Sequence, residues 1–151
     1  MLKKVFATDN SLVLLVLRLM LALVFFPHGA QKVFGWYGGN GFGPTLGFFV
    51  SKGIPAALAF LAIMAESAGV AALVAGLFTR VAALGLAVNM IICAAANHIQ
   101  NGFFMNWTGK QAGEGFEFHI LVVAIALGLM IGGGGRWSLD GLISRKGLAR
   151  N

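Results

Sequence analysis

Two charged residues lie inside apolar stretches that are long enough to cross a lipid bilayer. Arg18 falls within the stretch from about residue 11 to 29, and Glu66 falls within the stretch from about 55 to 78. Each stretch approaches the roughly 20 residues that a membrane-spanning helix requires. An ionised side chain is costly in hydrocarbon, so such residues usually face the interior of a helix bundle and serve a function. We therefore predict Arg18 and Glu66 as site residues.

The positions of Arg18 and Glu66 make an ion pair between them feasible. A rise of about 1.5 Å per residue places them several Å apart in depth, which the long guanidinium side chain can span. Two interpretations of such a pair stay open. It could be a structural ion pair that fixes the register of the bundle. It could also line a polar cavity in which a proton or a quinone-like ligand is handled.

All three histidines are expected at one membrane face, because they lie at the ends of apolar segments. His28 ends the first segment, His98 ends the third, and His119 starts the fourth, with Glu114 and Glu117 nearby. Three helix ends at one level could make a site, although a single interfacial histidine is usually a hydrogen-bonded surface residue. Glu117 and His119 are two residues apart and cannot point the same way once the helix has begun.

The sequence gives little indication of a metal centre. No HxxxH or HxxE spacing occurs, so any set of ligands would depend on the tertiary structure. We predict no metal site; if a metal ion were bound, its ligands would be His28, His98 and His119. Cys93 is the one cysteine, lies in an apolar run, and is predicted to be a small packing residue.

The composition explains which elements must position these residues. The chain has 151 residues, of which 58% are hydrophobic and 11% are charged, and this balance is typical of membrane proteins. The net charge of +6 arises from lysines and arginines scattered at the ends of apolar runs. That distribution indicates membrane topology and argues against a nucleic-acid partner.

Four apolar segments can be drawn in the sequence, and backbone groups in lipid must bond internally, so each segment is predicted to be a helix. The predicted fold class is therefore all-α, a polytopic membrane protein with a four-transmembrane-helix bundle in one domain, residues 1–151. A tight turn at Thr79-Arg80 makes the second and third helices antiparallel neighbours. The predicted helices span about 11–29, 55–78, 81–97 and 116–131.

The distribution of basic residues predicts the orientation of the bundle. An even number of crossings puts both termini on one side, which carries most of the lysines and arginines, and the positive-inside bias makes that side cytoplasmic. We predict a multi-pass protein of a bacterial-type cytoplasmic (inner) membrane. Two long aromatic and glycine-rich loops, about 30–54 and 98–115, then lie on the outer, periplasmic side. They are typical of an interfacial belt, or of a re-entrant cap over the bundle.

Several short motifs occur in a fixed order along nearly the whole chain. They are Arg18; His28-Gly29-Ala30-Gln31-Lys32; Phe34-Gly35 and Gly38-Gly39; Ala65-Glu66 with Gly69; Gly76-Leu77-Phe78-Thr79-Arg80; His98 before Gly102-Phe103-Phe104; Glu117; and Gly135-Arg136-Trp137-Ser138-Leu139-Asp140. In this order the chain resembles the DoxX family of small four-helix membrane proteins. One departure is the all-glycine run before Arg136, where family members often have a proline.

The resemblance implies redox chemistry at the membrane. Relatives include a membrane subunit of thiosulfate:quinone oxidoreductase and proteins associated with quinone or thiol stress, while many members have no assigned activity. The resemblance therefore implies the fold of the protein more firmly than the reaction it takes part in. Carried over by position, the candidate residues are Arg18, His28, Lys32, Glu66, His98 and Glu117.

We therefore predict a membrane redox accessory or quinone-interacting subunit with a polar pocket open to the periplasmic face. The histidines and Glu117 would form the mouth of this pocket, and Arg18 with Glu66 its floor. The sequence has no recognisable flavin, nicotinamide or iron–sulfur motif, so electrons would come from a protein partner. This favours a subunit of a quinone-linked oxidoreductase over a self-sufficient enzyme.

The expected ligands and partners follow from this prediction. We expect a bound quinone, no covalently attached cofactor, and neither haem nor metal. The expected partners are the lipid bilayer and either a protein subunit or further copies of the chain. Two other functions stay open: a small transporter or exporter acting as a homo-oligomer, and a structural module that binds a membrane partner.

Overall fold

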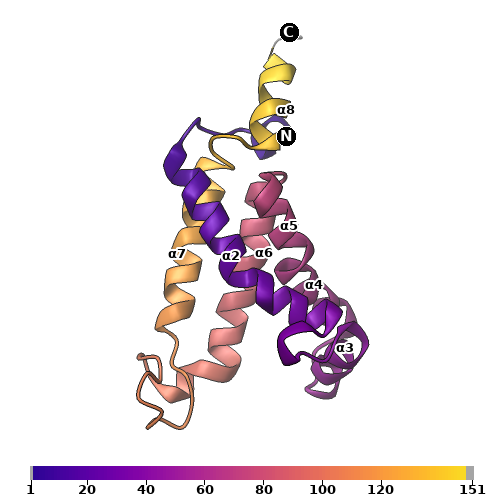
Figure 1. The fold of residues 1–151 in the computed structure, drawn as a ribbon, viewed down its shortest axis with the longest axis vertical. Helices are drawn as coiled ribbons and strands as arrows, with labels where there is room; N and C mark the ends of the chain where they lie inside the picture. The colour runs from indigo at the N-terminus through magenta and orange to yellow at the C-terminus, as the bar shows by residue number, and fades with distance from the viewer. Residues whose placement is uncertain (1, 149–151) are drawn as a thin grey trace.

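Four crossings are made up of the helices α2 (Leu12–Phe34), α4 (Ala56–Glu66) with α5 (Ala68–Ala75), α6 (Thr79–Cys93) and α7 (Glu117–Gly132), and they run along the long direction of the molecule (Figure 1). The computed structural model describes residues 2–148, in which every regular element is a helix. The predicted all-helical bundle is therefore confirmed.

Shorter elements connect the crossings or flank them. The two terminal helices, α1 (Leu2–Val5) and α8 (Leu139–Leu148), lie at the same end of the molecule (Figure 1). An even number of crossings accounts for this placement. The remaining elements are η1 (Trp36–Gly38), α3 (Phe42–Ser51), the π-helical turn η2 (Ala94–His98), and the 3-10 turn η3 (Ile99–Asn101).

Three helical stretches are long and apolar enough to cross a bilayer: Leu12–Phe34, Ala56–Ala75 and Thr79–Asn101. The apolar helix Glu117–Gly132 has 16 residues, close to the lower limit of roughly 17 for a spanning helix. The chain is thus a multi-pass membrane protein. The choice of inner membrane and the cytoplasmic location of the termini stay predictions from the charge distribution.

Apolar side chains occupy both the inside and the outside of the bundle. Leu73, Leu86 and Leu129 are fully buried in the core, whereas Leu23 is 63% exposed and Ile131 is 79% exposed. In water such exposed leucines and isoleucines would be unfavourable over so large an area, whereas lipid tails are as apolar as the side chains themselves. The outer face therefore fits a lipid environment.

The first crossing is longer than predicted, because no strong stop signal occurs until Gly35. This residue adopts a left-handed conformation, with φ at 73°, and ends α2 five residues beyond the predicted limit of 29. The added turn contains Lys32, which the predicted helix had left in a loop. Consequently Lys32 stands on a helix, three residues after Gly29 and on the same face.

The second crossing is interrupted, which the predicted continuous helix over 55–78 did not include. Ser67 separates α4 from α5 with φ at −114° and ψ at −75°, and its hydroxyl donates to the carbonyl of Ile63 at 2.7 Å. A hydroxyl bonding back to the preceding turn is a known cause of helix bending. Glu66 is therefore the last residue of α4, immediately before the interruption.

The turn between the second and third crossings lies earlier than Thr79-Arg80. Gly76, with φ at 63°, ends α5, and α6 already begins at Thr79. The carboxylate of Asp140 accepts hydrogen bonds from the backbone N–H groups of Phe78 at 2.7 Å and Thr79 at 2.9 Å. These bonds satisfy donors that have no partner within α6, so Asp140 acts as its N-terminal cap.

The first long loop contains a helix, α3, that packs against α4 and α2 (Figure 1). The rings of Phe42 and Phe60 meet edge to face with centroids 6.2 Å apart across the α3–α4 contact. The second long loop, 102–116, lies at the same end of the molecule, opposite α8 (Figure 1). The cap predicted to cover the bundle is therefore a helix beside α4.

Candidate functional site

A polar cavity of about 360 Å³ opens near the end of the bundle that carries the two long loops. Every crossing contributes to it: α2, α4, α6 with η2, and α7. Its wall combines charged, imidazole, sulfur and aromatic groups, a mixture that is unusual inside a membrane bundle. The lining residues are Phe25, His28, Lys32, Glu66, Met90, Cys93, His98, Met105, Glu114, Phe118 and His119.

One side of the polar cavity holds a buried ion pair. The Lys32 ammonium pairs with Oε2 of Glu66, and the Asn89 side-chain amide donates to Oε1 of Glu66 at 2.6 Å. The side chain of Glu66 is 6% exposed and that of Lys32 is 22% exposed. Both carboxylate oxygens are therefore engaged, as burial of a charge requires. The bond from Asn89 joins α6 to α4.

Close packing of α2 on α4 brings this pair together. A β-carbon added at Gly29 would overlap the carbonyl oxygen of Glu66 and lie 3.1 Å from the α-carbon of Ser67. Glycine at this position lets the two backbones meet at the interruption of the second crossing. Lys32, one turn further along α2, then reaches the carboxylate of Glu66.

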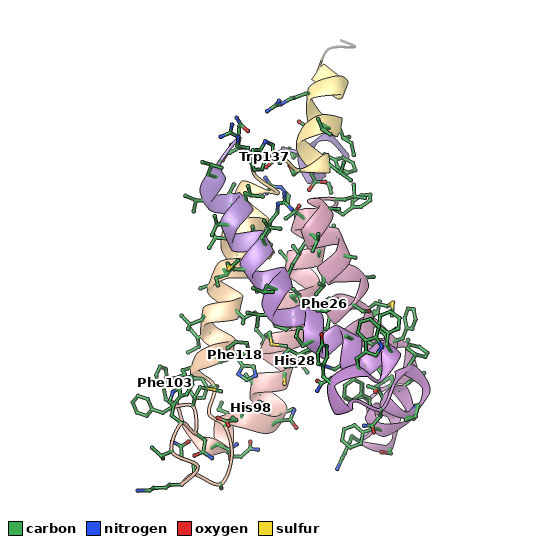
Figure 2. All side chains as sticks on the ribbon, viewed as in Figure 1. Phe26, His28, His98, Phe103, Phe118 and Trp137 are labelled. Carbon is green, nitrogen blue, oxygen red and sulfur yellow. The ribbon has the colours of Figure 1, made fainter. Side chains whose placement is uncertain are left out.

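The other side of the polar cavity holds imidazoles. The rings of His98 and His119 have centroids 4.3 Å apart, and His119 is 7% exposed. Nδ1 of His98 lies 2.9 Å from the carbonyl oxygen of Glu114, whereas Nδ1 of His119 is buried and has no hydrogen-bond partner within residues 2–148. Figure 2 shows His28, His98 and Phe118 in the space between α2, α6 and α7.

Five of the seven residues predicted for the site line the polar cavity. They are His28, Lys32, Glu66, His98 and His119. Arg18 and Glu117 do not line it.

Arg18 forms a structural network near the terminal helices. Its side chain is 1% exposed, and its guanidinium donates to backbone carbonyls. The accepting oxygens belong to Leu73 and Val74, both at 2.7 Å, Gly134 at 2.8 Å, and Trp137 at 3.0 Å. Leu73 and Val74 are in the last turn of α5, where carbonyl groups lack partners within the helix, and arginine offers five donors in a fixed plane.

The feasible pair between Arg18 and Glu66 therefore does not form in the described part of the chain. Each residue has a full set of other partners, carbonyl oxygens for Arg18 and Lys32 with Asn89 for Glu66. Arg18 and Glu66 therefore form neither an ion pair that fixes the register of the bundle nor a shared floor of the pocket, and both predictions were wrong. The position of a residue along a helix fixes its depth in the membrane but leaves the rotation of the helix undetermined, so equal depth does not make two side chains meet.

Glu117 holds the second long loop in place. Its Oε1 accepts hydrogen bonds from the backbone N–H of Met105 at 3.0 Å and from Nε1 of Trp107 at 3.3 Å. The helix α7 begins at Glu117, so this side chain and that of His119 diverge, as their two-residue spacing predicted. Glu117 shapes the loop above the polar cavity and stands outside the cavity wall.

Sequence reasoning missed the sulfur groups of this cavity. Cys93, Met90 and Met105 all line it, although Cys93 was expected only to pack against neighbours. The available signal was the five-residue spacing between Cys93 and His98, which is uninformative for a regular α-helix. It gains meaning only with the π-helical turn between them.

An apolar groove of about 410 Å³ adjoins the polar cavity between α6 and α7. The two hollows share Met90 and His119 as lining residues. Apart from His119, the residues of the groove are apolar: Met90, Ile91, Ala94, Ala95, Ile99, Phe116, Ile120, Val123, Ala124 and Leu127.

Comparison with protein families supports the resemblance noted in the sequence. The DoxX family profile matches residues 13–99, which is more than half of the chain. The match covers α2 to α6 and includes Arg18, Lys32 and Glu66. Comparisons with curated proteins and with solved structures gave no match. From this profile match and the helical membrane fold, we conclude that the chain belongs to the DoxX family.

Proposed function

We propose that this protein binds the head group of a quinone in the polar cavity, as a subunit of a quinone-linked redox system. The observation that carries the proposal is the joining of proton-carrying groups and apolar walls in one cavity. The cavity of about 360 Å³ is lined by polar residues, Lys32, Glu66, His98 and His119, and by Phe25 and other apolar residues. Pockets of this size and mixed character are typical of small-molecule sites.

The polar groups match what a quinone ring presents. A quinone supplies two carbonyl acceptors, and its reduction to the quinol takes up two electrons and two protons. Lys32 retains hydrogen-bond donors beyond its contact with Glu66, because an ammonium group carries three. The unpartnered Nδ1 of buried His119 is a further group that gains from a ligand.

The apolar groove gives the same ligand a place for a hydrocarbon tail. It adjoins the polar cavity at Met90 and His119 and is lined by side chains of α6 and α7. A head group in the cavity and an isoprenoid tail in the groove would match the polarity of both hollows. Electrons would come from a protein partner, consistent with the absence of flavin, nicotinamide and iron–sulfur motifs in the sequence.

Calorimetric titration of decylubiquinone into the purified protein in detergent micelles tests this proposal. We expect saturable binding that is weakened about tenfold or more in Lys32→Met, because a hydrogen bond to a charged group contributes about 1.5–3 kcal/mol. In His28→Asn we expect a weakening of about two- to tenfold, because an ordinary hydrogen bond contributes about 0.5–1.5 kcal/mol. The His28→Asn variant leaves the Lys32–Glu66 pair intact, so its loss of affinity cannot be ascribed to a broken ion pair.

A matched lysine serves as the control for this titration. Lys52 follows α3 and stands over the ring of Phe48, outside the lining of the polar cavity. Lys52→Met should bind decylubiquinone as the wild type does. Equal affinity in the wild type and the two cavity variants, or no saturable binding by folded wild type, would overturn the proposed quinone site.

Transport is a second candidate, and the interruption of the second crossing favours it. Broken helices beside a polar site near the middle of the membrane are a feature of many transporters. Here Glu66 lies directly before the interruption at Ser67 and lines the polar cavity. Flux of a labelled solute across proteoliposomes, measured beside the quinone titration of the same preparation, separates the two functions.

A further inference from the structure

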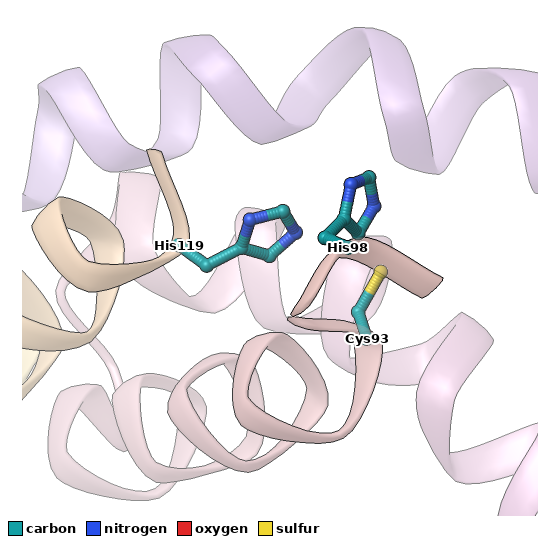
Figure 3. Close-up of side chains that lie close together, drawn as sticks. All are labelled: Cys93, His98 and His119. Atoms are coloured by element: carbon teal, nitrogen blue, oxygen red, sulfur yellow. The ribbon is translucent and has the colours of Figure 1, made fainter. Parts of the chain in front are cut away.

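Cys93, His98 and His119 bring one sulfur and two ring nitrogens together in the wall of the polar cavity. One ligand atom from each residue lies within 4.8 Å of those of the other two. Figure 3 shows the sulfur of Cys93 directed towards the ring of His98, with the ring of His119 reaching towards both from α7. We call these three residues the Cys-His-His cluster.

The π-helical turn η2 explains how Cys93 and His98 come to lie on one side. In an α-helix of 3.6 residues per turn, residues five apart differ by about 140° in direction. A π-helical turn bonds residue i to residue i+5, so that residues five apart lie close together. The turn Ala94–His98 follows Cys93 directly and so brings the thiol and the imidazole together.

Hydrogen bonding prepares the two imidazoles differently. Nδ1 of His98 faces the carbonyl oxygen of Glu114 at 2.9 Å, and a carbonyl can only accept, so Nδ1 carries the proton. Nε2 of His98 is then the ring nitrogen with a free lone pair. A carbonyl on the far nitrogen is the usual support of a metal-bound histidine. In His119, which is 7% exposed, Nε2 is the ring nitrogen directed towards Cys93 and His98 (Figure 3), whereas Nδ1 is buried and has no hydrogen-bond partner among the described side chains and backbone.

The donor set indicates which metal the cluster suits. A thiolate with two imidazoles selects late transition ions over the oxygen-preferring Mg²⁺ and Ca²⁺. Two thioethers, those of Met90 and Met105, line the same cavity. One cysteine, two histidines and a more distant methionine form the donor set characteristic of copper sites that carry electrons. Zinc sites, in contrast, use thiolates and imidazoles without thioether sulfur.

We propose that the Cys-His-His cluster binds one copper ion, with the thioether of Met90 or Met105 available as a further donor. Metal bonds of about 2.0–2.3 Å require ligand atoms roughly 3.3–3.8 Å apart. The cluster therefore closes by about 1 Å on binding, which side-chain rotation supplies. This replaces the expectation of no metal site, and Cys93 takes the place that His28 held among the conceivable ligands. The proposal concerns copper binding alone and stands without the quinone.

Anaerobic loading of the purified full chain with Cu⁺, in competition with a chromophoric Cu⁺ chelator, tests the proposal. We expect one copper per wild-type chain and a weakening of roughly a hundredfold or more in Cys93→Ala and in His98→Asn. Copper-edge X-ray absorption should then show sulfur and nitrogen scatterers in the wild type, with the sulfur contribution reduced in Cys93→Ala. Circular dichroism of each variant identifies those that have kept the helical fold.

His28→Asn is the matched control, because it removes a histidine from the same cavity and leaves the Cys-His-His cluster intact. It should bind copper like the wild type while binding decylubiquinone more weakly, so failure of the copper site and failure of the quinone site give different results. The copper proposal is overturned if folded Cys93→Ala and His98→Asn retain wild-type affinity. It is equally overturned if the wild type binds Zn²⁺ at the cluster and no Cu⁺.

Discussion

Replacing Lys32 by methionine should destabilise the protein, because it leaves the buried carboxylate of Glu66 without its counter-ion. Breaking a buried pair from one side costs about 3–5 kcal/mol, whereas an exposed pair contributes less than about 1 kcal/mol. Glu66 is 6% exposed but Lys32 is 22% exposed, so the pair lies between these limits and nearer the buried one. We expect a loss of about 3 kcal/mol in the free energy of unfolding.

Changing Glu66 to glutamine should cost less than Lys32→Met. The amide oxygen of glutamine can still accept from Asn89, which now donates to Glu66 at 2.6 Å, and no buried negative charge remains. Lys32 keeps partial exposure, so its unpaired ammonium costs about 1 kcal/mol. The double variant, Lys32→Met with Glu66→Gln, should lose only about 1–2 kcal/mol of unfolding free energy, because it no longer contains the Glu66 carboxylate that lacks a counter-ion in Lys32→Met.

The coupling energy between the two substitutions is therefore about 2–3 kcal/mol, or roughly 30- to 160-fold in the unfolding equilibrium. Reversible unfolding in mixed micelles, followed by far-UV circular dichroism, measures all four proteins of the cycle. Lys52→Met is the control for loss of a lysine at the same end of the molecule, and should change stability by less than about 0.5 kcal/mol. Additive effects within about 0.5 kcal/mol would refute the assigned pairing of Lys32 with Glu66.

Two further substitutions test close contacts between helices, one beside the polar cavity and one near the terminal helices. Gly29→Ala should lower the unfolding free energy by about 1–3 kcal/mol, because its β-carbon meets the backbone of Glu66, whereas Gly47→Ala in α3 meets no atom within 4 Å and should not destabilise. Equal effects of the two alanines in the same unfolding assay would contradict this. Arg18→Lys should cost about 3 kcal/mol or more in that assay, because three donors cannot serve all the carbonyls that Arg18 now satisfies. Arg136→Lys on the exposed surface is the control for Arg18→Lys. If both variants lost the same small amount of unfolding free energy, the hydrogen bonds of Arg18 would contribute little to stability.

Four of the cavity residues, His28, Glu66, His98 and His119, could be predicted from the sequence, because buried charge and histidines at helix ends stand out against an apolar background. Glu66 and His98 were predicted from such positions, and both line the polar cavity. Lys32 entered through the family resemblance alone, since the predicted first helix ended at residue 29. The extension of α2 to Phe34 is what carries Lys32 to Glu66.

Helix rotation decided which polar groups meet. Arg18 and Glu66 have compatible depths, yet Arg18 turns towards the last carbonyls of α5 and Glu66 turns towards Lys32 and Asn89. Depth follows from residue number along a helix, whereas direction depends on packing against every neighbouring helix. The sequence therefore indicated that both residues are engaged and could not assign their partners.

The sequence by itself determined that this protein lies in a membrane and that it is helical, because long apolar runs can cross a bilayer only as helices. It also determined the family, because the family motifs occur in a fixed order along the chain. Only the tertiary structure decided the composition of the site. Local departures from the regular α-helix, at Ser67 and in the π-helical turn after Cys93, reset the directions of the side chains that follow. Periodicity assumes an unbroken helix, so it cannot foresee that a thiol five residues from an imidazole will share its cavity.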